Sequence, residues 1–443
     1  MSTRVHHRWP LFYYTYGVRK SPFHSVRPSS LLKRPLTLSF RGAKRRGICC
    51  VLVHSLILLS GGASAQTKPS SNSFDSLSQR AATARDADRL DEAARLYKQA
   101  LALRPQWAEG WWSLGTLEYD QDHHANAAQA FEKLIALDPR NGTAHAMLGL
   151  CQFELHNDEP ALKNLLDAER LGIVKDEQLR KVALYHLGVL QLRTRKFGDA
   201  KETLDQLAKD GVRTKELITA LGLSALLVKP QEASPEGTAG AGVIERAGEA
   251  EALLAAEDFG QAKQRYAQLT GEFPDYPNLH FAFGRLLLET HETDEAVEEF
   301  QRELKRDPRN VNSLLEIAAV RYQLDSADGV KYARQAVKLD PQRPFGHYLL
   351  GLLYLDTQNF SGAISELETA KRSHPNVPEV YFALGNAYAK AGRKQDAVRA
   401  RATFRRLSAQ NKSEQTDTAY GDQPLGLTKK QLGTDAPPKP PNL

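Results

Sequence analysis

The chain contains few of the residues that carry redox, metal or covalent chemistry. It has three cysteines, two methionines and four tryptophans among 443 residues. Cys49 and Cys50 are neighbours near the N-terminus, and Cys151 is the third cysteine. A framework of internal disulfide bonds is therefore excluded as the source of stability. Apolar runs also fall short of the roughly 20 residues that a membrane-spanning helix needs, so we expect no stable membrane span.

Acidic residues are absent from residues 1–65, although 11 of the 59 Lys and Arg residues lie there. All 53 Asp and Glu residues follow this region. The formal net charge of +6 therefore comes from the N-terminal region, and the rest of the chain is mildly acidic. A mildly acidic body disfavours nucleic acid as a partner, because binding to phosphates needs a basic surface.

The end of the acid-free region has the order of a secretory signal peptide. Residues 44–46 are basic, and residues 48–59 form an apolar run that only His and Ser interrupt. Ala63 and Ala65 then place small residues where a signal peptidase requires them, which predicts cleavage before Gln66. We expect a periplasmic or secreted protein of the bacterial envelope.

Residues 1–46 are unusual for a signal peptide because they are long and rich in Arg and aromatic residues. Either translation starts downstream of Met1, at a Val or Leu codon, or the stretch is an organelle transit peptide. We favour a bacterial chain with a downstream start. Arg45 and Arg46 fit an ordinary basic region better than a twin-arginine signal.

Regularly spaced prolines are the strongest feature of the remaining chain. They form two series, each with a period of about 34 residues: Pro105 and Pro139, then Pro274, Pro308, Pro341 and Pro375. Each proline follows an amphipathic phrase such as YKQALALRP or FQRELKRDP. A period of this length, with a proline that breaks a helix at the end of each unit, is typical of a helix–turn–helix solenoid. In register with the prolines, the chain divides into about ten units.

Small residues recur at two positions of these units. The first predicted helix carries a glycine in most units: Gly115, Gly149, Gly188, Gly222, Gly284, Gly351 and Gly385. The second helix carries an alanine: Ala93, Ala127, Ala161, Ala200, Ala262, Ala296, Ala363 and Ala397. Small residues at facing positions let the two helices of a unit approach closely.

Together with large residues such as Trp111, Phe131, Phe300 and Tyr388, this pattern resembles the tetratricopeptide repeat family. The resemblance covers about residues 74–409. It implies an all-α fold: an α-solenoid, wound as a right-handed superhelix, of about ten helix–turn–helix units with an interruption in the middle.

Composition and repeat phase divide the chain into six segments. They are a leader with a signal peptide (1–65), a short linker (66–73), an N-terminal array (74–228), a flexible linker or loop (229–242), a C-terminal array (243–409) and a disordered, polar, Pro-rich tail (410–443). The glycines of the central linker are not expected to form a nucleotide-binding loop, because no strand precedes them.

No catalytic constellation is present. His123 and His124 lie near Asp120 and Asp122, but the further ligands of a metal site are missing, so we interpret them as an exposed polar turn. The apolar neighbours of Cys151 indicate packing rather than a nucleophile. We expect no enzymatic activity, no metal and no cofactor.

The family resemblance implies a concave groove lined by the first helix of each unit. Its inward positions would be Trp112, Thr116, Tyr119, Tyr185, Phe281, Arg285, Tyr322, Tyr348, Phe382 and Asn386. Aromatic side chains with a few amides and cations suit an extended peptide. The alternative is that several of these residues pack against neighbouring helices. A pattern that clamps a C-terminal carboxylate is not expected, because Asn386 alone matches it.

These observations predict an exported scaffold or adaptor that binds protein or peptide partners through its concave groove. The identity of the partner does not follow from the sequence. The alternative function is an envelope polysaccharide-binding or enzyme-accessory protein, whose groove aromatics would stack on sugar rings.

Overall fold

The computed structural model describes residues 73–173 and 176–414, and this part of the chain is helical with no β-strand. The expected signal cleavage site at Ala63, Ala65 and Gln66 lies outside the described residues, as does most of the expected tail. Among the described residues, none of the helices has the length and apolar character needed to cross a membrane.

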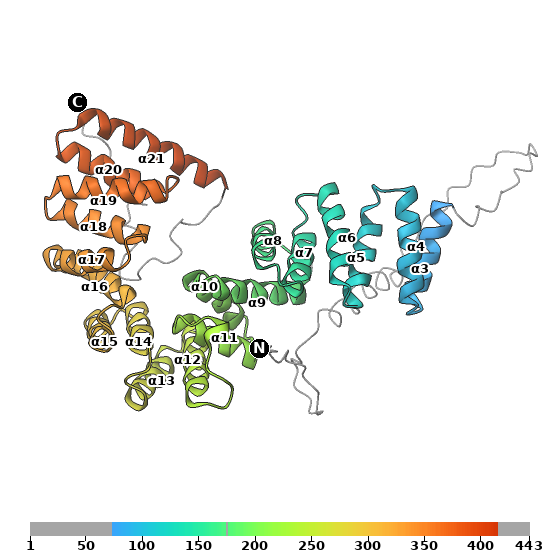
Figure 1. Ribbon diagram of the computed structural model, residues 1–443, viewed down its shortest axis with the longest axis horizontal. Helices are drawn as coiled ribbons and strands as arrows, with labels where there is room; N and C mark the ends of the chain where they lie inside the picture. The colour runs from blue at the N-terminus through green and yellow to red at the C-terminus, as the bar shows by residue number, and fades with distance from the viewer. Residues whose placement is uncertain (1–72, 174–175, 415–443) are drawn as a thin grey trace, which may run out of the picture.

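Consecutive helices pack in pairs, and the pairs stack into an α-solenoid (Figure 1). The N-terminal helices are α3 (Phe74–Asp86), α4 (Leu90–Leu103), α5 (Ala108–Asp120), α6 (His124–Leu137), α7 (Gly142–Glu154), α8 (Asp158–Leu171), α9 (Glu177–Arg193), α10 (Phe197–Lys209) and α11 (Lys215–Ala225). A short 3₁₀ helix, η2 (Pro230–Glu232), follows. The remaining helices are α12 (Ala239–Ala255), α13 (Phe259–Glu272), α14 (Leu279–Glu289), α15 (Thr293–Arg306), α16 (Val311–Leu324), α17 (Ser326–Leu339), α18 (Pro344–Asp356), α19 (Phe360–Ser373), α20 (Pro378–Lys390) and α21 (Lys394–Glu414).

The turn inside most pairs contains one residue with a positive φ angle, which reverses the chain within a short stretch. These residues are Asp88, Asp122, His156, Arg195, Glu257, His291, Gln358 and Gly392. The pair α16–α17 differs, because Asp325 alone separates its helices and its side chain accepts a hydrogen bond from the backbone N–H of Asp328. This shorter turn explains why Pro308 and Pro341 lie slightly closer in sequence than the other neighbouring prolines of the two series.

The recurrent glycines lie where the two helices of a pair touch. A Cβ atom at Gly115 would come within 2.8 Å of the Phe131 ring, and one at Gly284 within 2.5 Å of the Phe300 ring. The same contact joins Gly149 to Leu165, Gly188 to Leu204 and Gly351 to Leu367, always at the same spacing in the sequence. The expected close approach of paired helices is therefore present. In each of these pairs, a Phe or Leu side chain of the second helix packs against the glycine of the first helix.

The expected linker over residues 229–242 is shorter than its composition indicates. Its end is helical, because α12 begins at Ala239, and α12 packs directly against α11. One apolar core runs without interruption from Leu184 in α9 to Ile317 in α16. The two arrays are thus one continuous solenoid, and the expected interruption is confined to a loop on its surface. The helical region also extends past residue 409, since α21 ends at Glu414.

The solenoid is bent (Figure 1). The units from α3 to α8 form one arm, and the units from α16 to α21 form the other. Helices α9 to α15 lie at the bend between them. This bend brings the turn between α9 and α10 close to α14, α16 and the start of α18, which come much later in the chain, and there it encloses a cavity.

Candidate binding groove

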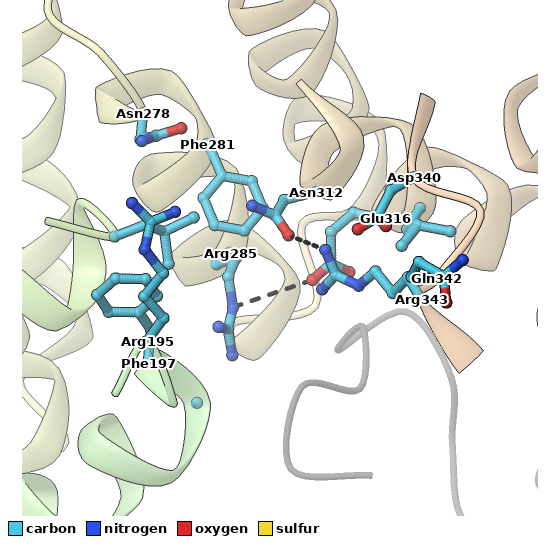
Figure 2. A pocket seen from close by; sticks show the side chains of 13 residues that line it. Arg195, Phe197, Asn278, Phe281, Arg285, Asn312, Glu316, Asp340, Gln342 and Arg343 are labelled. Atoms are coloured by element: carbon cyan, nitrogen blue, oxygen red, sulfur yellow. Dashed lines mark hydrogen bonds and ion pairs between the residues drawn. The ribbon is translucent and has the colours of Figure 1, made fainter. Parts of the chain in front are cut away.

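A cavity of about 560 Å³ lies on the inner side of the bend (Figure 2). Three parts of the chain line it. Helices α14 and α16, with the residue that precedes α14, provide Asn278, Phe281, Arg285, Asn312, Leu315 and Glu316. The α9–α10 turn with the start of α10, and the turn after α11, provide Arg195, Phe197, Gly198 and Leu227, and the α17–α18 turn provides Asp340, Gln342 and Arg343.

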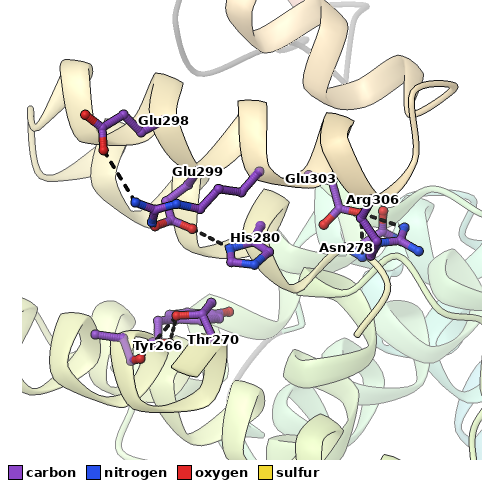
Figure 3. Close-up of polar contacts among 10 residues, drawn as sticks. Tyr266, Thr270, Asn278, His280, Glu298, Glu299, Glu303 and Arg306 are labelled. Carbon is purple, nitrogen blue, oxygen red and sulfur yellow. Dashed lines mark hydrogen bonds and ion pairs between the residues drawn. The ribbon is translucent and has the colours of Figure 1, made fainter. Parts of the chain in front are cut away.

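Asn278 fixes the wall at the start of α14. It has a φ angle of +59°, and its backbone N–H donates to a carboxylate oxygen of Glu303 at 3.1 Å. Its side-chain amide donates to the Leu226 carbonyl at 3.0 Å and accepts from Asn310 at 2.8 Å. Glu303 is fully buried and also accepts from Arg306 (Figure 3). Several elements are therefore tied to one residue, so this wall is preformed.

A second buried polar contact holds α14 against α15. The Nδ1 atom of His280 lies 2.5 Å from a carboxylate oxygen of Glu299 (Figure 3). Both side chains are buried, and Glu299 also accepts a hydrogen bond from Arg302. Removal of Glu299 would therefore leave His280 without its carboxylate partner in a buried setting. The helix that carries Phe281 and Arg285 into the cavity is thus anchored on its far side.

Three guanidinium groups face the cavity or its rim. Arg343 donates from Nη1 to the side-chain oxygen of Asn312 at 2.6 Å, and Arg195 donates to Glu232 at 3.2 Å. The Arg285 side chain is 21% exposed, and its Nε atom is 4.0 Å from the nearest Glu316 oxygen. That separation is an ion pair without a hydrogen bond. The cavity has a mixed polar and apolar lining, with Glu316 and Asp340 as its two acidic residues.

The sequence-predicted groove residues do not form one site. Phe281 and Arg285 line the cavity together. Five others are partly exposed on four inner helices, α5, α9, α16 and α20: Trp112, Tyr185, Tyr322, Phe382 and Asn386. Trp112 packs its ring edge to face with Phe131, and Phe382 lies 5.4 Å from Phe404 between ring centroids. A ligand contact for these five residues stays a prediction.

The expectation of an accessible groove position is wrong for Thr116, Tyr119 and Tyr348, whose side chains are buried. Thr116 donates its hydroxyl to carbonyls of its own helix at 3.1 Å. Tyr119 and Tyr348 belong to apolar cores between stacked units. In each case the packing of successive units covers the side chain. Phe281 is only 4% exposed, so it contributes to the wall rather than an open face.

Sequence reasoning missed eleven of the thirteen residues that line the cavity, among them Arg195, Asn312, Glu316 and Arg343. Glu316 lies one helical turn after Asn312 on α16, which is the inner helix next to α14, so the repeat register could have found both. Arg195 and Arg343 lie in turns of different units. Only the bend of the solenoid brings them to the same cavity.

The other residues considered in the sequence have structural partners. His123 lies 3.0 Å from the buried carboxylate of Glu118, which also accepts from Asn126 at 3.1 Å and pairs with Lys98 at 2.7 Å. Burial alone would raise the pKa of Glu118, but these hydrogen bonds and the Lys98 charge lower it overall. Across residues 73–173 and 176–414 we find no cluster of three or more groups that could bind a metal ion. Cys151 is buried, and burial raises the pKa of its thiol.

Stacked helix pairs with a repeated glycine contact define this protein as a helical-repeat solenoid. Three family models, each described as tetratricopeptide repeat, match residues 79–142, 114–172, 182–210, 253–317, 314–378 and 348–410. Together they cover most of the described chain, and the chain belongs to the tetratricopeptide repeat family.

Individual relatives are distant. Superkiller protein 3 of Schizosaccharomyces pombe is 24% identical over 323 residues, which is 70% of this chain. The chain spans about a fifth of the length of that protein, because the match covers 21% of it. A crystal structure of MamA is 17% identical over 37% of this chain and 96% of its own, with a TM-score of 0.35. A MamA RS-1 double mutant gives a TM-score of 0.36 at 17% identity, over 38% of this chain and 98% of that chain.

Proposed function

We propose that this protein is an exported scaffold that binds a protein or peptide partner on the inner side of its solenoid. Tetratricopeptide repeat solenoids are typical mediators of protein–protein contacts, and the family membership supports that general role. The observation that carries the proposal is the cavity, lined by both polar and apolar residues, where α14 and α16 face the α9–α10 turn.

The cavity suits an extended peptide. The hydrogen bonds of Asn278 hold the start of α14, the helix that carries Phe281 and Arg285, so this wall needs little ordering when a ligand binds. The carboxamides of Asn312 and Gln342 suit the N–H and C=O groups of a peptide backbone, whereas Phe281 and Leu315 offer apolar contact.

The alternative of a polysaccharide-binding protein has less support. Stacking on sugar rings needs exposed aromatic faces, and Tyr119 and Tyr348 are buried. We also propose that the chain has no catalytic role, because the polar residues of the cavity are cations, amides and two carboxylates without a nucleophile beside a base.

Site-specific photocrosslinking tests the location of the binding surface. We expect a photoreactive residue at Gln342, on the rim of the cavity, to capture the same partner as one at Trp112 or Phe382. The matched control is Lys331, whose side chain is 77% exposed on the outer helix α17. Capture at Lys331 and not at the inner positions would place the partner on the convex face and contradict the proposal.

Two substitutions then test the inner surface with the captured partner. Trp112→Ala and Phe382→Ala should weaken binding and leave helix content nearly unchanged, because both side chains are partly exposed. Truncation of a fully buried aromatic residue would instead lower the free energy of unfolding by about 3–5 kcal/mol. A binding titration and a thermal melt on each variant separate these outcomes.

Export is tested at the N-terminus. If residues 44–65 act as a signal peptide, the mature protein begins at or near Gln66 and is recovered from the cell envelope or medium. N-terminal sequencing of the fractionated protein measures this directly. A cytosolic chain that retains residues 1–65 would exclude export without affecting the binding role.

A further inference from the structure

We infer that the cavity selects a partner segment that carries an aspartate or glutamate side chain, and that Arg285 binds its carboxylate. The inference rests on the proposed function, since it assumes that the cavity is where the partner binds. It adds the chemistry of the partner, which neither the family nor the repeat pattern specifies.

Arg285 is a partly buried cation whose Nε atom has no hydrogen-bond acceptor among the described residues. About four fifths of its side chain is shielded from solvent, and the Nε atom itself is buried. Glu316 neutralises part of the charge from 4.0 Å but accepts no hydrogen bond from Nε. A buried N–H group without an acceptor is unfavourable, and a guanidinium binds a carboxylate through paired, charge-assisted hydrogen bonds. A ligand carboxylate would supply the missing acceptors.

The surroundings of Arg285 add positive charge. Arg195 and Arg343 contribute two more guanidinium groups. Arg343 donates to the neutral amide oxygen of Asn312, whereas Arg195 is paired with the carboxylate of Glu232, which does not line the cavity. Gly198 also lines the cavity and is the second residue of α10, whose N-cap residue Lys196 forms no side-chain capping hydrogen bond. Amides in the first turn of a helix lack partners within the helix and favour negative charge.

The acidic residues of the cavity limit which anion fits. Glu316 and Asp340 would repel a doubly charged phosphate more strongly than a singly charged carboxylate. The cavity is lined by units from the middle of the solenoid, and both arms extend beyond it (Figure 1). A segment that binds along the inner side would therefore continue past the cavity in both directions. We therefore favour an acidic side chain within a segment over a C-terminal carboxylate.

Selection from a random peptide library tests this inference while the natural partner is still unidentified. Random dodecapeptides are selected on the immobilised full chain, and the enriched sequences are synthesised with both ends blocked. Binding is measured by fluorescence anisotropy for each peptide and for its Glu→Gln or Asp→Asn form. We expect an acidic residue in the enriched sequences and at least about tenfold weaker binding after its neutralisation.

Three variants of the protein assign the effect to the cavity. Arg285→Gln should abolish the difference between the acidic and neutral peptides. Arg309→Gln is the matched control, because Arg309 is exposed and outside the cavity, and it should preserve the difference. Glu316→Gln should tighten binding of the acidic peptide, because it removes a competing negative charge. If Arg285→Gln fails to fold by circular dichroism, Arg285→Lys and Glu316→Gln carry the test.

The outcomes separate the two proposals. Peptides that bind equally in acidic and neutral forms, or whose preference survives Arg285→Gln, would overturn the inference and leave the groove as the binding surface. Peptides that bind only with a free C-terminus would also overturn it, because the carboxylate would then come from the chain end. Failure to enrich any peptide would count against both the inference and the proposed function.

Discussion

At the residue scale, one side chain joins each of four units to the proline of the unit before it. Trp111, His145, His347 and Tyr381 lie near the start of a first helix, and each lies within hydrogen-bonding distance of a proline carbonyl six residues earlier, at 2.8, 3.3, 3.0 and 2.8 Å. Carbonyl groups at the C-terminal end of a helix have no hydrogen-bond donor within the helix. The proline carbonyl just after that end finds its partner in the side chain of the next unit. The repeat therefore keeps one hydrogen bond with three different residue types.

Cys151 provides a test of buried packing at this scale. It is fully buried in the core between α6, α7 and α8, so Cys151→Ala should lower the free energy of unfolding by about 1 kcal/mol. Partner binding should be unchanged. Urea unfolding measures the loss, and a thiol reagent should react with the native protein only after denaturant is added. Loss of binding with intact helix content would instead indicate thiol chemistry.

At the scale of elements, the contact between α11 and α12 makes the solenoid continuous. Gly222 and Gly248 face each other, and a Cβ atom at Gly222 would lie 1.9 Å from the Ile244 carbonyl oxygen, and one at Gly248 1.8 Å from that of Ile218. Only glycine permits this approach, because backbone atoms cannot move aside as a side chain can. The two helices that flank the Pro- and Gly-rich segment are thus in direct backbone contact.

Gly248→Ala should therefore destabilise the protein by about 3 kcal/mol, at the upper end of what overpacking costs. Gly242→Ala in the same helix is the matched control, because no atom lies within 4 Å of its would-be Cβ. That change should raise stability by up to about 1 kcal/mol, since alanine favours a helix over glycine. Urea unfolding of both variants checks the opposite signs. Equal effects would show that α11 and α12 are not in contact.

At the scale of the whole molecule, a buried ionic cluster holds the bend. Lys201 in α10 lies 2.8 Å from Asp205, 3.0 Å from Glu251 in α12 and 3.8 Å from Glu289 in α14. Tyr266 in α13 donates its hydroxyl to Glu251 at 2.5 Å. Three carboxylates thus share one ammonium group. Glu289 is one helical turn from Arg285, so the cluster joins α10 to the helix that carries the cavity wall.

The cluster predicts a pH dependence of stability. Burial, and to a smaller degree Glu251 and Glu289, raise the pKa of Asp205 from its ordinary 3.8 to about 6, even though Lys201 opposes the shift. The folded state therefore holds this proton more tightly than the unfolded chain. The stabilisation is complete below about pH 4 and is lost as the pH rises through about 6.

Asp205→Asn should remove this dependence. We expect the variant to gain stability relative to the wild type between pH 5 and pH 7, by about 1 kcal/mol, because the wild type alone ionises there. Asp275→Asn, at an exposed position, is the control and should show no such change. Urea unfolding at both pH values measures the difference. If the wild type and Asp205→Asn changed equally in stability from pH 5 to pH 7, the pKa of Asp205 would not be raised in the folded state.

The sequence was most informative where a local contact repeats. The glycine and alanine positions, the helix pairs and their number were predictable, because each unit buries the same face against its neighbour. The prediction that Tyr119 and Tyr348 line an open groove was wrong. A residue that faces inward in a single unit becomes part of the core when the next unit packs over it. Prediction also failed for the linker over 229–242, because a composition rich in Gly and Pro does not reveal that Gly248 and Gly222 meet.

The sequence by itself determined the class of this protein: a helical-repeat solenoid whose helices, turns and closing prolines follow from contacts within one unit and with the next. The tertiary structure alone decided where the solenoid bends and what that bend encloses. Arg195, Arg285 and Arg343 are far apart in sequence and lie in different units, so no local pattern relates them. They share a cavity because small differences in the angle between successive units accumulate along the stack, and that sum is a property of the packing of all units together.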